Sequence, residues 1–165
     1  MRTVLFAFLF LQAGHSLAQT SRSAVGAMPF SQSGAQELTR QGAELLAQAQ
    51  SSTAGSAGMT LETYPGHYTM LTARVKSGGP ELHKNFSDIF VILDGEATEV
   101  VGGSLVDPQE ASPGEVHGSA LVGGERHVMK KGDVVHILAG VPHQTLLAEG
   151  AKLVYYVIKV EVPKQ

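Results

Sequence analysis

Two histidines and one aspartate lie at positions where the sequence predicts the ends of strands. His143 follows a Gly-Val-Pro turn at the start of a predicted strand, and His83 and Asp88 lie just before an apolar segment, residues 89–93. Imidazole nitrogens and carboxylate oxygens are common ligands of divalent first-row metals, and side chains at strand ends can converge on one ion. The sequence therefore predicts that His83, Asp88 and His143 form a metal site.

Asn85 is a further candidate in the same stretch, through its amide oxygen or a bridging water. It shares a face with His83, because side chains alternate with a period of two along a strand. Two imidazoles and one carboxylate suit Fe(II), and also Mn(II), Ni(II) or Zn(II), better than Mg(II) or Ca(II), which prefer oxygen ligands. The alternative interpretation is that both histidines are hydrogen-bonded strand-end residues and that Asp88 caps a turn.

The strands that would position these residues fill the C-terminal part of the chain. Residues 67–75 alternate between two faces, and residues 89–93 and 97–101 flank Asp94-Gly95, a pair typical of a two-residue hairpin turn. Residues 105–115 contain two prolines and predict a loop. Further short strands are expected at residues 119–122, 126–129, 134–137, 145–147 and 153–162. This spacing predicts an all-β antiparallel sandwich or barrel.

The first 18 residues have the pattern of a secretory signal peptide. Arg2 gives a positive start, and residues 4–11 form an apolar run that is too short to span a bilayer. Ser16-Leu17-Ala18 then places small residues at the minus-three and minus-one positions of a cleavage site. We therefore expect a mature protein that is periplasmic or secreted and has no membrane span. The alternative interpretation is a buried N-terminal helix.

Residues 19–58 form a predicted N-terminal arm ahead of the barrel domain, residues 59–165. The apolar residues of segment 34–49 recur on one helical face, and Ser33 is a suitable N-cap. The Ser-, Ala- and Gly-rich segment 51–58 is typical of a flexible linker. Such a helix docks either on its own domain or on a twin subunit. Because a small barrel exposes sheet edges and the arm is long enough to cross, we predict a homodimer.

The overall composition excludes several classes of protein. The chain has no cysteine, so it has neither a disulfide framework nor a lipoprotein anchor. Without residues 1–18 it carries 11 basic and 15 acidic side chains, and its longest basic cluster is Lys130-Lys131, which argues against a nucleic acid partner. The remaining 147 residues suit one domain with a single hydrophobic core.

The stretch around His143 resembles the second motif of the cupin superfamily, Gly-x5-Pro-x-Gly-x2-His-x3-Asn. Gly132, Gly140 and His143 are in register with this motif. Leu138 stands where the family has proline, and Leu147 stands where it has asparagine.

The stretch before Gly95 resembles the first cupin motif, Gly-x5-His-x-His-x3,4-Glu-x6-Gly. Asp88 precedes Gly95 by the required six residues and replaces the glutamate. His83 matches one of the two histidines, and Asn85 stands in place of the other. The resemblance covers the predicted barrel domain and implies a double-stranded β-helix, or jelly-roll, barrel with a short N-terminal helical arm. It also implies metal ligands at His83, Asp88 and His143, with Asn85 as an additional candidate.

Two classes of function agree with these observations. One is a metal-dependent enzyme that acts on a small molecule, of the dioxygenase, isomerase or lyase type, in which the ion activates the bound ligand. The other is a non-catalytic small-molecule or sugar-binding cupin of the cell envelope. The sequence contains no nucleophile motif, nucleotide loop or acid–base pair that favours an enzyme independently of the metal, so both remain open.

Overall fold

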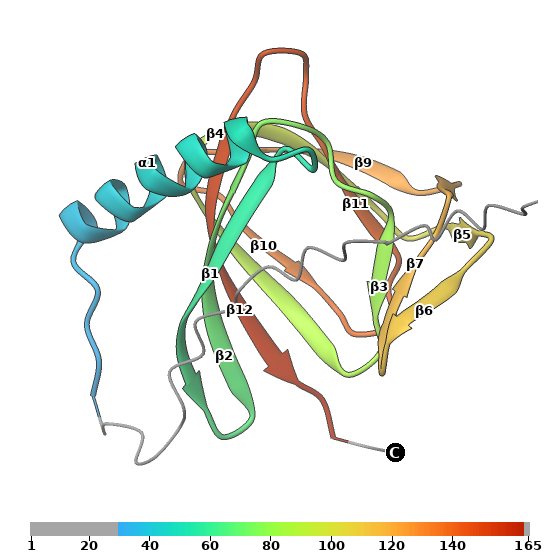
Figure 1. Cartoon of the computed structure of the whole chain (residues 1–165). Coiled ribbons are helices and arrows are strands. Elements are labelled where there is room, and N and C mark those ends of the chain that lie inside the picture. Colours follow the sequence, from blue (N-terminus) through green and yellow to red (C-terminus); the bar gives the residue numbers. More distant parts are fainter. Residues whose placement is uncertain (1–29, 164–165) are drawn as a thin grey trace, which may run out of the picture.

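The computed structural model describes residues 30–163, which form one helix and a curled set of antiparallel strands (Figure 1). In chain order the elements are α1 (Ala35–Ser51), β1 (Ser56–Tyr64), β2 (His67–Arg74), β3 (Glu81–His83), β4 (Phe86–Val101), β5 (Ser104–Val106), β6 (Gln109–Ser112), β7 (Glu115–His117), β8 (Ala120–Val122), β9 (Glu125–Lys130), β10 (Val134–Ile137), β11 (His143–Leu146) and β12 (Leu153–Glu161). The all-β jelly-roll prediction is confirmed.

The main sheet has ten strands and encloses the apolar core. Its order is β1-β2-β12-β4-β11-β3-β7-β6, and β9 and β10 also pair with β4, while β5 and β8 form a separate two-stranded sheet. Alternate residues of β12, namely Leu153, Tyr155 and Val157, are buried in one cluster with Phe90 and Ile92 of β4. Because side chains alternate along a strand, Lys159, the next residue of this β12 series, also faces the interior of the barrel.

The predicted hairpin turn at Asp94-Gly95 is wrong, because both residues lie within strand β4. The strand runs without interruption through this pair, where its register with β12 shifts. Gly95 has a φ of 87°, and a Cβ atom there would lie 1.9 Å from the carbonyl oxygen of Lys152. The strand therefore has a bulge beside this pair and no turn, because a paired strand on each side holds both halves of β4 extended. The first half pairs with β10 and β12, and the second half pairs with β9 and β11.

The predicted loop at residues 105–115 is also wrong, since this stretch contains the end of β5, all of β6 and the first residue of β7. Strand β7 pairs with β3, so that Glu115 lies opposite His83. Pro108 precedes β6, and Pro113 lies between β6 and β7, so neither proline interrupts a strand. The segment therefore contributes a side chain to the region around His83.

Helix α1 packs on the outer face of its own sheet, next to β1 and β2 (Figure 1). Leu45 of α1 is buried in a cluster with Leu71, Ala73 and Val154. The N-cap is Gly34, without a side-chain hydrogen bond, and not Ser33 as predicted. The predicted linker is wrong as well, because β1 already begins at Ser56 and pairs with β2 along its length. The docked helix removes the crossing arm as a reason for a homodimer, which stays a prediction.

The predicted signal peptide, residues 1–18, lies outside the described residues. Among residues 30–163, no helix is long and apolar enough to cross a membrane.

Candidate metal site

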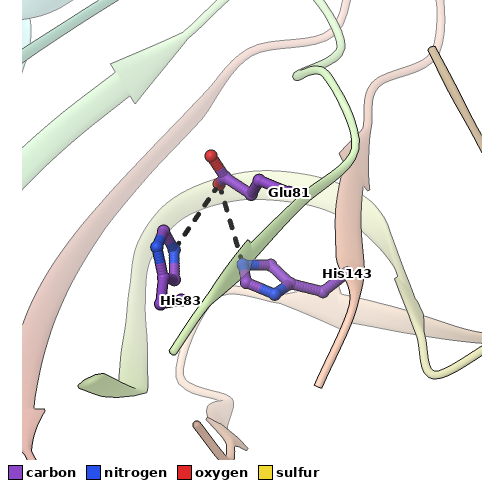
Figure 2. A group of neighbouring side chains, drawn as sticks. All are labelled: Glu81, His83 and His143. Carbon is purple, nitrogen blue, oxygen red and sulfur yellow. Dashed lines mark ion pairs between the residues drawn. The ribbon is translucent and has the colours of Figure 1, made fainter. Parts of the chain in front are cut away.

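Three side chains from two neighbouring strands converge inside the barrel (Figure 2). Glu81 and His83 lie on β3, and His143 begins β11, opposite Glu81 in the register. The Glu81 Oε1 atom lies 3.7 Å from His143 Nε2 and 4.0 Å from His83 Nε2. Each residue offers one ligand atom, and these atoms all lie within 4.8 Å of one another, so the three residues form a group that could bind a metal ion.

Each imidazole is oriented by a hydrogen bond at its Nδ1 atom. His83 Nδ1 contacts a carboxylate oxygen of Glu115, and His143 Nδ1 lies 3.1 Å from the backbone oxygen of Val141. Because both partners are acceptors, each Nδ1 atom carries the proton and donates it, which leaves the Nε2 lone pair free in the neutral ring. Carboxylate and carbonyl partners of this kind commonly fix the orientation of metal-binding histidines.

Both Nε2 atoms are buried and have no hydrogen-bond partner among residues 30–163. A buried polar atom without a partner loses its hydration and gains nothing in return, so such atoms are rare unless a ligand or ion satisfies them. Two imidazole nitrogens beside a carboxylate are the donor set of divalent first-row ions. The residues therefore fit a transition-metal ion.

Asp88 also lies near the two imidazoles and is paired with a lysine. Its Oδ2 atom lies 3.3 Å from His83 Nε2 and 3.8 Å from His143 Nε2. Lys159 Nζ, on β12, lies 2.7 Å from each Asp88 oxygen and donates a hydrogen bond to Oδ2. Burial alone would raise the pKa of Asp88, but the nearby imidazole of His83 and the charge of Lys159 outweigh burial and lower it.

The two histidines differ in their affinity for a proton. Burial lowers the pKa of His143, and the Val141 carbonyl offsets this effect only in part. Burial also acts against protonation of His83, but the adjacent carboxylate of Asp88, helped by Glu81, outweighs burial and raises the pKa of His83. Neutral imidazole is therefore favoured at His143 by the protein alone.

Solved structures share the architecture of this barrel. A structure of oxalate oxidase in complex with the substrate analogue glycolate is 17% identical to this chain, covers 67% of it and has a TM-score of 0.50, and the chain spans only 53% of that protein. The chain has the cupin fold. A predicted oxalate decarboxylase from Thermotoga maritima is 15% identical, with 65% of this chain and 81% of that one covered and a TM-score of 0.48. No protein-family model and no curated protein matches the sequence.

Within the cupin fold, Glu81 is the site residue that the sequence prediction missed. Its signal is the spacing of the first cupin motif. If Glu81 takes the place of the first histidine and His83 that of the second, four residues separate His83 from Asp88 and six separate Asp88 from Gly95, as the motif requires. With His83 at the first histidine instead, Asn85 falls at the second position, and the gap to Asp88 is one residue too short.

Asn85 is not part of the group that converges in Figure 2. Its amide nitrogen lies 2.2 Å from the position that a Cβ atom at Gly114 would take, next to the turn between β6 and β7. Its side chain also lines a surface pocket of about 650 Å³ that includes Ser87, Leu138 and Val162. The structure thus brings His83, His143 and Asp88 together as expected, whereas a role for Asn85 as a ligand stays a prediction without a supporting contact.

A second buried carboxyl group, Glu99 of β4, lies near this site and was not predicted. Its side chain is 0% exposed; Oε2 accepts a hydrogen bond of 2.7 Å from Thr145, and Oε1 has no partner among residues 30–163. Thr145 follows His143 by two residues on β11, so both point into the barrel. Burial, with a smaller contribution from the charge of Glu81, raises the pKa of Glu99 to about 7. The barrel thus holds an ionisable acid close to the histidine group.

Proposed function

We propose that Glu81, His83 and His143 bind one divalent first-row transition-metal ion, Fe, Mn, Ni or Zn, and that a small molecule binds beside it in the barrel. The observation that carries this proposal is the pair of buried imidazole Nε2 atoms that face a carboxylate and have no partner of their own. When bound, the ion would act as a Lewis acid that polarises or activates the small molecule.

The side chains around the site have separate tasks. Glu115 and the Val141 carbonyl hold the two imidazole rings so that Nε2 faces Glu81. Strand β7 places Glu115 opposite His83 in the sheet, and the His83 side chain is 7% exposed. Because one carboxylate and two neutral imidazoles leave part of an octahedral shell free, the site offers positions to a ligand.

Glu99 favours an enzyme over a non-catalytic binding protein. A carboxyl group with a pKa near 7 can donate or accept a proton at neutral pH, which is the property required of a general acid or base. We therefore propose a metal-dependent enzyme of the dioxygenase, isomerase or lyase type. A protein that binds a sugar or another small molecule without metal and without turnover would support the alternative function.

Metal analysis of variants tests the metal site. We expect about one equivalent of metal in the reconstituted parent protein and a large loss of metal in His83→Ala, His143→Ala and Glu81→Gln. His136→Ala is the matched control, because His136 pairs with Ile89 on β4 but is exposed, so its side chain lies on the outer face of β10. Equal metal in His143→Ala and in the parent would contradict the proposal.

We also propose that the protein is exported after cleavage at Ala18. The proposal is supported by the charged start, apolar run and small residues of segment 1–18. Mass spectrometry of protein from the cell envelope or medium should find an N-terminus at or near Gln19. An intact Met1 in the cytosol would contradict it.

A further inference from the structure

Lys159 places a charged group inside the barrel next to the proposed metal ligands. It lies opposite Asp88 in the pairing of β12 with β4 and belongs to the series of β12 residues that faces the core. The lysine side chain is 11% exposed and that of Asp88 is 2% exposed. A buried lysine is costly unless it is paired, so this ion pair fixes both side chains in place.

Distance alone does not decide which carboxylate would bind the ion. Atoms that share one ion at about 2.1 Å lie roughly 3 to 4 Å apart. Asp88 Oδ2 meets this spacing to both imidazoles, at 3.3 Å and 3.8 Å, at least as well as Glu81 Oε1 does, at 4.0 Å and 3.7 Å. The difference is electrostatic, because Glu81 has no lysine or arginine within ion-pair distance among the described residues.

We propose that Lys159 keeps Asp88 out of the coordination shell, so that the ion has three protein ligands and keeps positions open for a small molecule. This inference rests on the proposed metal site and assigns Lys159 as a positioning residue. Lys159 donates its hydrogen bond to Oδ2, the same Asp88 oxygen that lies near both imidazole Nε2 atoms. An ion bound to this oxygen would lie close to the buried ammonium group, and like charges at short distance repel each other strongly in a buried site.

The charges of the site lead to the same expectation. Glu81 and Asp88 carry two negative charges, and Lys159 offsets one of them. Without the lysine, the site would attract a divalent cation more strongly, and Asp88 would be free to become a fourth ligand. Lys159 thus lowers the affinity of the site for the metal ion and leaves coordination positions open.

Replacement of the lysine tests this inference. We expect Lys159→Met to bind Zn²⁺ about 10- to 100-fold more tightly than the parent in a calorimetric titration, as is typical when the surroundings of metal ligands change. The visible absorption spectrum of the Co²⁺-loaded variant should also differ from that of the parent, because it reports the number and type of ligands. Lys159→Gln removes the same charge while keeping a hydrogen-bond donor, and it replaces Lys159→Met if the latter does not fold.

Two controls separate this effect from a general change in charge. Lys152→Met also removes one positive charge, but its partner is the exposed Asp94, 2.8 Å away, and it should bind Zn²⁺ as the parent does. The double variant Lys159→Met/Asp88→Asn lacks the proposed fourth ligand and should lose the gain in affinity.

The outcomes distinguish this inference from the proposed function. Unchanged or weaker Zn²⁺ binding by folded Lys159→Met, beside a parent that binds one equivalent, would overturn the role of Lys159 alone. A gain that persists in the double variant would also overturn it. If neither the parent nor the variant binds Zn²⁺, both the inference and the metal site are wrong.

Discussion

Strand β7 orients the proposed metal ligand His83 through a hydrogen bond to Glu115. The carboxylate accepts the Nδ1 proton of His83, which fixes the ring and leaves Nε2 as the free nitrogen. It also raises the electron density on the imidazole and so strengthens its bond to a metal ion. Glu115 therefore matters for metal affinity although its own oxygens are not among the converging ligand atoms.

Glu115→Gln should weaken metal binding by about 10- to 100-fold without loss of the fold, because the amide keeps the shape of the side chain but is a poorer acceptor. A competition titration with a chelator of known affinity measures the change. The control is Glu110→Gln on the adjoining strand β6, whose carboxylate pairs with Lys84 and contacts no histidine. Equal affinity in Glu115→Gln and Glu110→Gln would show that the Glu115 contact does not orient His83.

Glu99 should make the metal-free protein less stable as the pH rises. Its pKa of about 7 in the folded chain exceeds the ordinary value of 4.5, so between these values the folded state binds more protons than the unfolded state. Its contribution to the free energy of unfolding is therefore most favourable below pH 4.5. This contribution declines as the pH rises to about 7, by at most about 3 kcal/mol. Above pH 7 the buried carboxylate is charged and the full cost is present.

Glu99→Gln should remove this decline, since the amide keeps an acceptor for Thr145 and does not ionise. Urea unfolding of parent and variant with a chelator present, at pH 5 and at pH 8, gives the difference in unfolding free energy. The variant should gain stability relative to the parent at pH 8. A difference between the two proteins that does not change with pH would contradict the raised pKa.

The continuous strand β4 contributes two buried carboxyl groups to the surroundings of the site. It carries Asp88 in its first half and Glu99 in its second half, and the bulge at Gly95 lets the two halves pair with different strands. One strand can therefore line the barrel interior next to both β12, with Lys159, and β11, with His143.

Gly95→Ala should destabilise the protein by roughly 3 kcal/mol or more, since it combines a positive φ with a contact that no Cβ atom can make. Gly132→Ala is the matched control. Gly132 has a similar φ of 94°, but a Cβ atom there meets nothing within 4 Å, so about 1 to 2 kcal/mol is expected. Thermal and urea unfolding of both variants measure the costs, and equal costs would show that the close approach at Gly95 is relieved by local movement.

The sequence was sufficient to predict the all-β barrel and to bring His83, Asp88 and His143 to one place. These predictions succeed because strand alternation and strand-end positions are local features of the chain. The hairpin at Asp94-Gly95 fails because the same pair can form a bulge when both sides are held by other strands, and that pairing is not local. Glu81 could not be recognised by residue type, because it is a carboxylate at a position where the motif has histidine.

The N-terminal arm also shows that local features of the sequence predict an element but not its packing partner. Its helix was predicted from its apolar face, and α1 confirms the helix. Which surface covers that face could not be predicted, since the Leu71 side of β2 becomes an outer apolar surface only after the barrel has closed. The docked helix then fixes β1 and β2 from Ser56 onward, so the short Gly- and Ser-rich segment does not behave as a linker.

A homodimer remains our prediction for the molecule as a whole. The helix is docked on its own sheet, and the prediction now depends on exposed apolar strand residues such as Val128 and Val134, both 66% exposed. Light scattering on the chain from residue 19 onward should give twice the mass of one chain at micromolar concentration. Val128→Ser and Val134→Ser identify the contact if one of them yields a monomer, and a single-chain mass for the parent would contradict the prediction.

The central claim is that one transition-metal ion lies among Glu81, His83 and His143. Anomalous X-ray diffraction from crystals of the Zn²⁺-reconstituted protein, recorded on both sides of the zinc absorption edge, tests it most directly. We predict one strong anomalous peak inside the barrel, within about 2.0 to 2.2 Å of both imidazole Nε2 atoms and of one Glu81 oxygen, with Asp88 still bound to Lys159. A barrel without this peak, or a peak only at exposed histidines such as His127 and His136, would contradict the account.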